Sequence, residues 1–200
     1  MTQGLLLLSG GQGTRMGSPK HALEHPAGGT WGGHLVGAFR AVFPQGGVQV
    51  LGEALPDEPS LPRLDDPRLG PAKALQAWAQ AEALEPPPER WWIVACDQVR
   101  WTPVSLRSWA VLCQQADPAN ERWVIAEHDG HLQPLGGWFP NLLRPQLAAV
   151  DAKSLLGLVA ALPHLVLPQL GEEWCDVDTP EEARRFRASI RLRSARRSAR

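Results

Sequence analysis

The 200-residue chain is 44% hydrophobic with a mean hydropathy of −0.22, values typical of one soluble globular domain. No apolar run approaches the ~18 residues that a membrane helix requires, and the first residues lack the basic and apolar regions of a secretory signal. The three cysteines are scattered without a CxxC pair, so they predict neither a disulfide framework nor a metal centre. We expect a cytoplasmic protein with no membrane partner.

Charge is unevenly distributed along the chain. Residues 1–183 carry 12 basic and 21 acidic side chains, a net charge of −9, and eight arginines follow from Arg184 to Arg200. A basic end can bind nucleic acid or another polyanion, but a solvated end of the last helix explains it as well. Because no aromatic residue after Phe186 could stack on a base, we expect no nucleic-acid partner.

Apolar runs alternate with helical patterns. Continuous apolar runs, typical of buried parallel strands, occupy residues 5–9, 48–51 and 91–96, with weaker ones at 123–128 and 164–167. Helical periodicity covers residues 34–42, 71–84, 103–115, 141–150, 154–162 and 180 onward. The alternation predicts one three-layer α/β/α domain over residues 1–186, with a mostly parallel sheet. Residues 187–200 would form a basic tail, either a helix end or disordered.

The first apolar run leads directly into a glycine-rich segment, LSGGQGTRMGSPK, at residues 8–20. In doubly wound sheets, ligands bind at the carboxyl ends of the strands. Gly10, Gly11 and Gly13 would leave backbone amides free to surround an anion, and Arg15 and Lys20 would add charge-assisted contacts. The segment therefore predicts a cradle for a triphosphate or pyrophosphate. A glycine-rich turn with two solvated cations is the alternative.

Two well-known phosphate loops do not match this segment. A P-loop requires serine or threonine after its lysine, whereas His21 follows Lys20. A dinucleotide-binding fingerprint requires a third glycine where this chain has Met16. A hydride-transferring enzyme is therefore disfavoured.

The glycine-rich segment resembles LAGGxxxRMGxxK, the signature loop of the nucleotidyltransferases, which bind a nucleoside triphosphate in a Rossmann-like domain. Within that superfamily, the chain most resembles the molybdenum cofactor guanylyltransferases over nearly its whole length. The resemblance implies Mg²⁺-dependent transfer of GMP from GTP to molybdopterin, with molybdoenzymes or cofactor-biosynthesis proteins as further partners. It also implies that Leu8, Ser9 and the three glycines bind the nucleotide, and that Arg15 and Lys20 are catalytic.

A second motif, ACDQVRWTP at residues 95–103, places Asp97 directly after an apolar run. It resembles the family's PCDxPxxP segment, which implies that Asp97 is catalytic, holds Mg²⁺ and contacts the nucleotide. A hard divalent ion bound to phosphates does need one or two protein carboxylates. Asp97 could instead cap the next helix, although Thr102 or Ser105 could fill that role.

A third motif, WCDVDTPEEARRF at residues 174–186, resembles the family's NVNTPEEL. Thr179 is the expected N-cap, with Pro180 as the first helical residue. Asp176 stands where related transferases place a second metal ligand, although the guanylyltransferases usually have asparagine there. Asp176 could therefore be either a second metal ligand or a carboxylate that supports the start of the helix.

A fourth segment, LDDPRLGPAKAL at residues 64–75, resembles the family's D…GPLxG, in which an aspartate touches the nucleotide. Either Asp65 or Asp66 could be that residue. The Ser-Pro pair before Lys20 is commoner in the related cytidylyltransferases, so the base preference is open. The alternative functions are a cytidylyl- or sugar-phosphate nucleotidyltransferase and a nucleotide-binding module without turnover.

Overall fold

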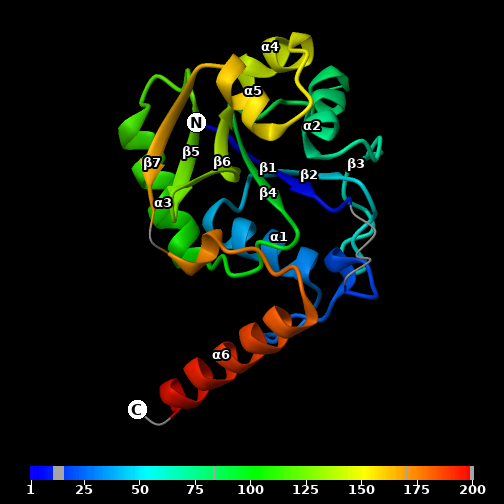
Figure 1. The fold of residues 1–200 in the computed structure, drawn as a ribbon, viewed down its shortest axis with the longest axis vertical. Helices are drawn as coiled ribbons and strands as arrows, with labels where there is room; N and C mark the ends of the chain where they lie inside the picture. The colour runs from blue at the N-terminus through cyan, green and yellow to red at the C-terminus, as the bar shows by residue number, and fades with distance from the viewer. Residues whose placement is uncertain (11–15, 83, 170, 199–200) are drawn as a thin grey trace.

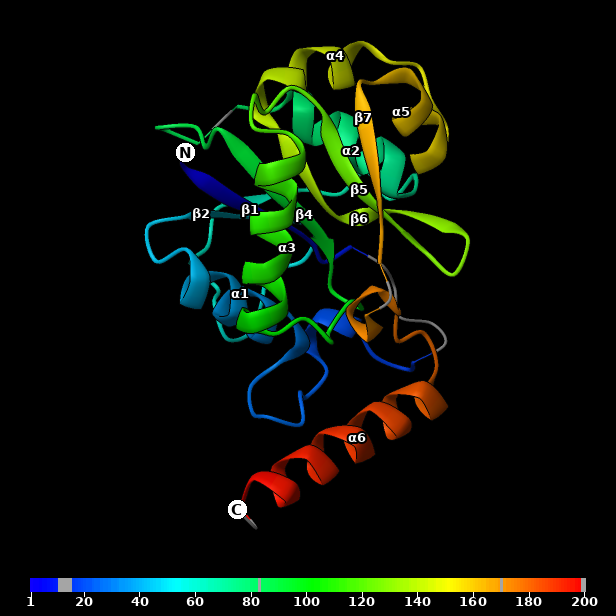
Figure 2. The same cartoon turned by 90° about the vertical axis from the view of Figure 1, so that its left-hand side faces the viewer.

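The computed structural model describes residues 1–10, 16–82, 84–169 and 171–198. Within these residues, seven strands form one sheet in the order β3-β2-β1-β4-β6-β5-β7 (Figures 1 and 2). The strands are β1 (Gln3–Leu8), β2 (Gly47–Leu51), β3 (Arg63–Leu64), β4 (Arg90–Ala95), β5 (Trp123–His128), β6 (His131–Pro140) and β7 (His164–Pro168).

The sheet is mostly parallel, as the alternation of patterns predicts. β1 lies between β2 and β4 and runs parallel to both, so that Leu8 pairs with Leu51 on one side and with Ala95 on the other. β2 and β3 lie on one side of β1 and β4 lies on the other, which makes the gap between β1 and β4 the topological switch point. The carboxyl ends of these strands therefore meet where a ligand is expected.

Helices cover both faces of the sheet (Figures 1 and 2). Two helices that contact each other pack on one face, and three pack on the other. The first pair is α1 (Trp31–Val42) and α3 (Pro103–Ala116), and the second group is α2 (Pro71–Gln80), α4 (Arg144–Ala149) and α5 (Leu155–Ala161). Short 3₁₀ turns η1 (Lys20–Ala22), η2 (Asn141–Leu143) and η3 (Glu172–Trp174) connect these elements. The predicted three-layer α/β/α class is confirmed.

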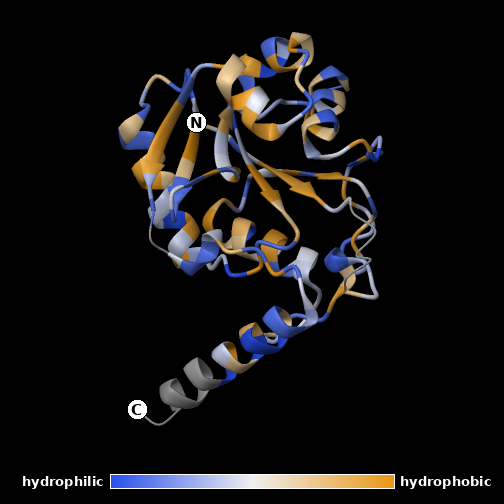
Figure 3. Cartoon of the chain, in the orientation of Figure 1, coloured by the Kyte–Doolittle hydropathy of each residue, from blue (hydrophilic) through white to orange (hydrophobic). Residues whose placement is uncertain are grey.

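The continuous apolar runs are buried on both faces. Leu5 and Leu7 belong to the core beneath α1 and α3, whereas Leu6 and Leu8 belong to the core beneath α2 and α5. Strand residues alternate between faces, so a run without polar positions fills two cores at once. Colouring by hydropathy shows the central strands as mostly apolar, whereas the first turns of helix α6 (Pro180–Ser198) mix polar and apolar residues (Figure 3).

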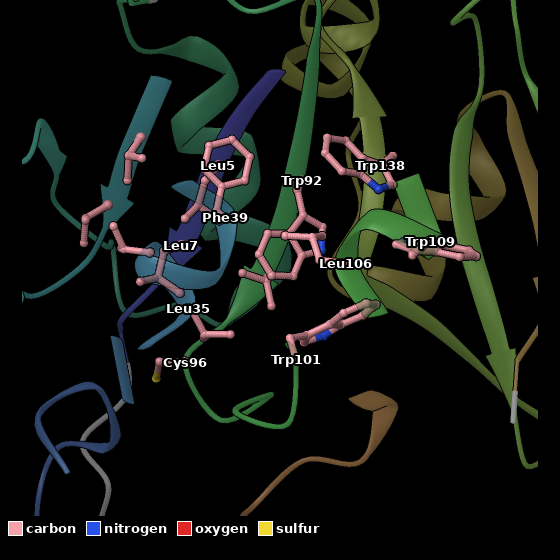
Figure 4. Close-up of a cluster of buried hydrophobic side chains, with 14 of the residues drawn as sticks. Leu5, Leu7, Leu35, Phe39, Trp92, Cys96, Trp101, Leu106, Trp109 and Trp138 are labelled. Carbon is pink, nitrogen blue, oxygen red and sulfur yellow. The ribbon is translucent and has the colours of Figure 1, made fainter. Parts of the chain in front are cut away.

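Tryptophans fill the core beneath α1 and α3 (Figure 4). Trp92 and Trp109 both donate their indole N–H to the carbonyl oxygen of Gly136, at 3.0 and 2.9 Å. Trp101 packs edge-on against Trp92, with ring centroids 5.4 Å apart. Packing of large rings in the core therefore accounts for much of the tryptophan-rich composition.

The predicted elements differ from the structure in several places. The second predicted helix ends at Gln80 instead of Leu84, because Arg144 donates to the carbonyl oxygens of Trp78 and Ala81 at its end. The predicted helix at 141–150 divides into η2 and α4. β6 is not among the predicted strands, because a proline and two glycines interrupt its alternation.

Helix α6 extends away from the body (Figures 1 and 2). Its first turns belong to a small core in which Phe186 packs with Trp31 and Val99. The guanidinium of Arg100 lies 5.3 Å from the centre of the Phe186 ring. The basic tail is therefore helical through Ser198. Among the described helices, none combines the length and apolar character needed to cross a membrane.

Candidate functional site

A cleft of about 1000 Å³ opens at the carboxyl ends of β1, β2 and β4. Its volume is at the upper end of the ~300–1000 Å³ typical of small-molecule sites. The lining includes strand-end residues, the η1 turn and acidic side chains from distant segments. Those used below are Leu8, Gly10, Lys20, His21, Gly52, Glu53, Arg63, Asp65, Asp66, Arg68, Asp97 and Asp178.

Lys20 and Asp97 meet at the switch point. The Cys96 N–H donates to the Leu8 carbonyl oxygen at 3.0 Å, which continues the ladder of β1 and β4 by one residue and brings Asp97 beside the start of the glycine-rich segment. The Lys20 ammonium donates to Asp97 Oδ2 at 2.9 Å and also to Asp178 Oδ1. Burial lowers the pKa of Lys20, but its hydrogen bonds to Asp178 and Asp97 outweigh burial and raise it. Lys20 is therefore a fixed positive charge in the cleft.

The segment before α6 completes an acidic cluster. The Val177 N–H donates to the Asp97 carbonyl oxygen at 3.1 Å, so Asp176 and Asp178 are held beside Asp97. Desolvation by the surrounding protein, followed by repulsion from Asp97 and Asp178, raises the pKa of Asp176 to about 7, although the residue as a whole is exposed. The three carboxyls therefore concentrate more negative charge than Lys20 alone neutralises.

The start of α6 holds this segment in place. Thr179 Oγ1 accepts from the Glu182 N–H at 3.2 Å, as expected of the predicted N-cap. Glu182 in return accepts from the backbone N–H groups of Asp178 and Thr179, both at 2.9 Å. This reciprocal capping box fixes the backbone that carries Asp178.

Asp97 does not cap the helix that follows it. Thr102 caps α3, with its side chain accepting from the Ser105 N–H at 3.1 Å and Ser105 Oγ accepting from the Thr102 N–H at 3.0 Å. The structural alternative for Asp97 is therefore excluded. Its carboxylate remains available to the cleft.

The donor set suits a divalent cation that also binds phosphate. Asp97 Oδ1 is buried and has no hydrogen-bond partner among the described residues. Asp176 lies close enough to Asp97 for each carboxyl to repel the other. Within the described residues, no group of three or more His, Cys, Asp or Glu side chains is arranged to enclose a metal ion alone. One or two carboxylates with substrate phosphates is the arrangement Mg²⁺ prefers.

Gly10 lies in close contact with two other cleft segments. A Cβ added at Gly10 would lie 1.8 Å from Asp66 Oδ2, and one added at Gly52 would lie 2.4 Å from the Gly10 nitrogen. Gly52 also has a φ of 123°, so glycine is required there, whereas a side chain at Gly10 would force the Asp66 carboxylate to move. The Ser9 hydroxyl donates to the Glu53 carbonyl oxygen at 2.7 Å, so the predicted nucleotide-binding Ser9 uses its side chain to join strand ends. Leu8 lines the cleft.

Asp65 and Asp66 differ in their surroundings. The Asp65 carboxylate is 90% exposed and lies 3.4 Å from Arg63. Asp66 Oδ1 accepts from the Arg68 N–H at 2.7 Å, and its other oxygen lies against Gly10. Both residues line the cleft, but Asp66 is the one in contact with the glycine-rich segment.

The remaining predicted residues, Gly11, Gly13 and Arg15, lie outside the described residues. Sequence reasoning did not assign Asp178 a site role, although the DVD pattern places it two residues after Asp176. It also missed Arg68, whose backbone has a φ of 59° and whose side chain lies 3.0 Å from Glu53. Nothing in the local sequence indicates that Arg68 lines the cleft.

One protein-family model matches most of the chain. Residues 5–165 match the MobA-like NTP transferase domain. No protein among the curated ones matches the chain.

Solved structures share the fold. Molybdopterin-guanine dinucleotide biosynthesis protein A from Archaeoglobus fulgidus is 15% identical, with a TM-score of 0.70 over 96% of this chain and 100% of that one. A manganese complex of Rv0371C from Mycobacterium tuberculosis H37Rv is 20% identical, with a TM-score of 0.63 over 94% and 100%. The 2-C-methyl-D-erythritol 4-phosphate cytidylyltransferase from Thermus thermophilus is 13% identical, with a TM-score of 0.61 over 96% and 100%.

These identities establish the fold alone, which agrees with the predicted one. The sequence match extends over most of the chain and includes most of β1, the η1 lysine and the aspartate after β4. The chain therefore belongs to the MobA-like NTP transferase domain family.

Proposed function

We propose that this protein catalyses Mg²⁺-dependent nucleotidyl transfer from GTP to molybdopterin, forming molybdopterin guanine dinucleotide and pyrophosphate. The observation that carries the proposal is the meeting of Lys20 and Asp97, 77 residues apart in sequence and 2.9 Å apart at the switch point. A cation and a carboxylate beside a large cleft are what a metal-bound triphosphate requires. The name of the Archaeoglobus neighbour supports the choice of acceptor.

Different cleft residues would bind the phosphates of the nucleotide and the metal ion. Lys20 and the Gly10 amide would contact the β- and γ-phosphates, and Asp97 with Asp176 would hold the metal ion. When bound, the ion supplies positive charge that stabilises the developing charge on the phosphates. The half-buried Asp66 carboxylate, beside Gly10, would contact the nucleoside.

The chemical step is a substitution at the α-phosphorus of GTP. An oxygen of the terminal molybdopterin phosphate forms a new bond to that phosphorus, and the bond to the bridging oxygen of the β-phosphate breaks with its electron pair leaving on pyrophosphate. The attacking phosphate is already ionised, so no general base is needed. Lys20 neutralises the pyrophosphate as it leaves.

Pyrophosphate release from GTP in the presence of molybdopterin and Mg²⁺ tests the proposal. We expect Lys20→Ala and Asp97→Ala each to lower turnover ~100-fold or more while the protein remains folded. Lys73→Ala and Asp151→Ala are matched controls, because those residues form a separate surface pair 3.6 Å apart. Near-normal turnover in either cleft variant refutes the assignment of that residue.

A cytidylyltransferase is the second candidate, favoured by the Ser-Pro pair before Lys20 and by the cytidylyltransferase among the structural neighbours. Replacing GTP with CTP in the same assay separates the two, since a guanylyltransferase should release pyrophosphate with GTP only. Thermal stabilisation by nucleotide without pyrophosphate release from either, with molybdopterin present, would indicate a binding module.

A further inference from the structure

Lys20 is held in the cleft by carboxylates from two distant segments. Asp97 follows β4 and Asp178 precedes α6, and both accept from the same ammonium group. The Lys20 side chain is only 17% exposed, whereas that of Asp178 is 48% exposed. The Lys20 side chain is therefore mostly buried, and its ammonium group contacts both a largely buried and a half-exposed carboxylate.

The capping box positions Asp178 to accept a hydrogen bond from Lys20. Its backbone N–H is bound to Glu182, and the neighbouring Val177 N–H is bound to the Asp97 carbonyl oxygen. The two carboxylates that share Lys20 are thus tied together through the backbone. In a solvated surface pair, forming the contact itself must order both side chains, which costs conformational entropy. Here the backbone that carries Asp178 is already fixed, so less entropy is lost when it binds Lys20.

We infer that Lys20 is an internal counter-ion of the metal site: it neutralises Asp97, is held there by Asp178, and is displaced toward the phosphates of the nucleotide when a cation binds. The inference rests on the proposed metal site and assigns Asp178 as a positioning residue that acts through Lys20. The Lys20 ammonium already occupies Asp97 Oδ2, so a divalent cation bound to the same carboxylate would lie close to it. The two positive charges would repel each other. The cation would therefore bind weakly alone and tightly together with a triphosphate, which offers Lys20 new anionic partners.

If Lys20 is a counter-ion, replacing it should lower turnover and raise the affinity for the metal ion in the same variant. Lys20→Met should lose turnover, yet it should bind Mn²⁺ alone about tenfold tighter than the unaltered protein, because a competing charge is removed. Titration calorimetry of the full chain with MnCl₂ measures this affinity. Lys73→Met, which makes the same change of charge at a surface pair outside the cleft, should leave Mn²⁺ affinity unchanged.

The outcomes separate this inference from the proposed function. Equal or weaker Mn²⁺ binding by Lys20→Met overturns the counter-ion role and leaves the metal site standing. Failure of both proteins to bind Mn²⁺, alone or with GTP, overturns the metal site itself and the inference with it. Tighter binding confined to Lys20→Met supports both.

Chemical acetylation gives a second measurement that does not require Lys20 to be replaced. Peptide mass spectrometry follows acetylation of Lys20 with Lys73 as internal reference. We expect Lys20 to be acetylated slowly, and faster when MnCl₂ displaces it from Asp97. Asp178→Asn should also speed its acetylation without MnCl₂. Unchanged Lys20 acetylation in both experiments contradicts the inference.

Discussion

The two ends of β4 each carry a charged pair, and they differ in what surrounds it. At the amino end, Arg90 and Asp117 are 2% and 1% exposed, and Arg90 donates to Asn120 Oδ1 at 2.5 Å and to the Asp117 carbonyl oxygen at 2.9 Å. At the carboxyl end, Lys20 and Asp97 are 17% and 21% exposed and border the cleft.

The second difference is hydrogen bonding. Asp117 Oδ2 accepts from the backbone N–H groups of Glu121 and Arg122, both at 3.0 Å. Asp97 Oδ1 is buried and has no partner among the described residues. A charged pair whose hydrogen bonds are satisfied within the protein serves the fold, because nothing is left for a ligand to satisfy. An unsatisfied oxygen beside a cleft is available for binding.

Replacing Arg90 should give the largest effect on stability. Arg90→Met leaves the Asp117 charge buried without its main partner, a change that costs roughly 3–5 kcal/mol in free energy of unfolding. Arg122 remains 3.4 Å from Asp117, so we expect the lower end, about 3 kcal/mol. Urea denaturation measures the loss, and turnover per folded molecule should be preserved.

Arg40→Met is the matched control, because Arg40 forms an exposed pair with Glu58 at 2.5 Å. An exposed pair contributes at most about 1 kcal/mol. Equal destabilisation by Arg90→Met and Arg40→Met would show that the buried pair is no more structural than a surface one.

His25 is a buried titratable residue that has no charged partner among the described residues, so it should make stability depend on pH. Its ring packs against Phe186 of α6 and is stacked on His34, with ring centroids 5.4 and 3.7 Å away, and its Nδ1 accepts from the Ala27 N–H at 3.1 Å. Burial, with repulsion from His34, lowers the pKa of His25 to about 4. In the unfolded chain its pKa is near 6.5, so the unfolded state binds the proton first as the pH falls.

The stability due to neutral His25 is therefore present above about pH 6.5 and lost as the pH falls toward about 4. The full loss is up to about 3 kcal/mol. Urea midpoints at several pH values between about 7 and about 4 measure it. His25→Phe should make this pH dependence shallower, leaving the part due to His34 and His21, whose pKa values burial also lowers. An unchanged slope would rule out His25 as the source.

The smallest expected effect distinguishes the adjacent residues Asp65 and Asp66, which both line the cleft. Asp66 lies against Gly10, so Asp66→Asn should raise the KM for the nucleotide about tenfold with little change in kcat. Asp65 is 90% exposed, so Asp65→Asn should change KM by less than about twofold. Steady-state kinetics decide between them, and a larger effect at Asp65 would reverse the assignment.

The sequence by itself determined the elements that depend on neighbouring residues. The run of leucines in β1 is buried on both faces because successive strand residues alternate, and Thr179 caps α6 because its partner Glu182 is three residues away. Asp97 could be placed at a strand end, and the strand end at the ligand-binding edge, without knowing any distance.

Only the tertiary structure decided which side chains meet at that edge. Lys20 and Asp178 are 158 residues apart, and the sequence contains no local pattern that joins them. The choice of Asp66 over Asp65 depends on the packing of Gly10, and the insertion of the antiparallel β6 beside β4 depends on pairing between strands. Periodicity and capping are local interactions, whereas contacts across a sheet edge are set by strand order, which the chain reaches only on folding.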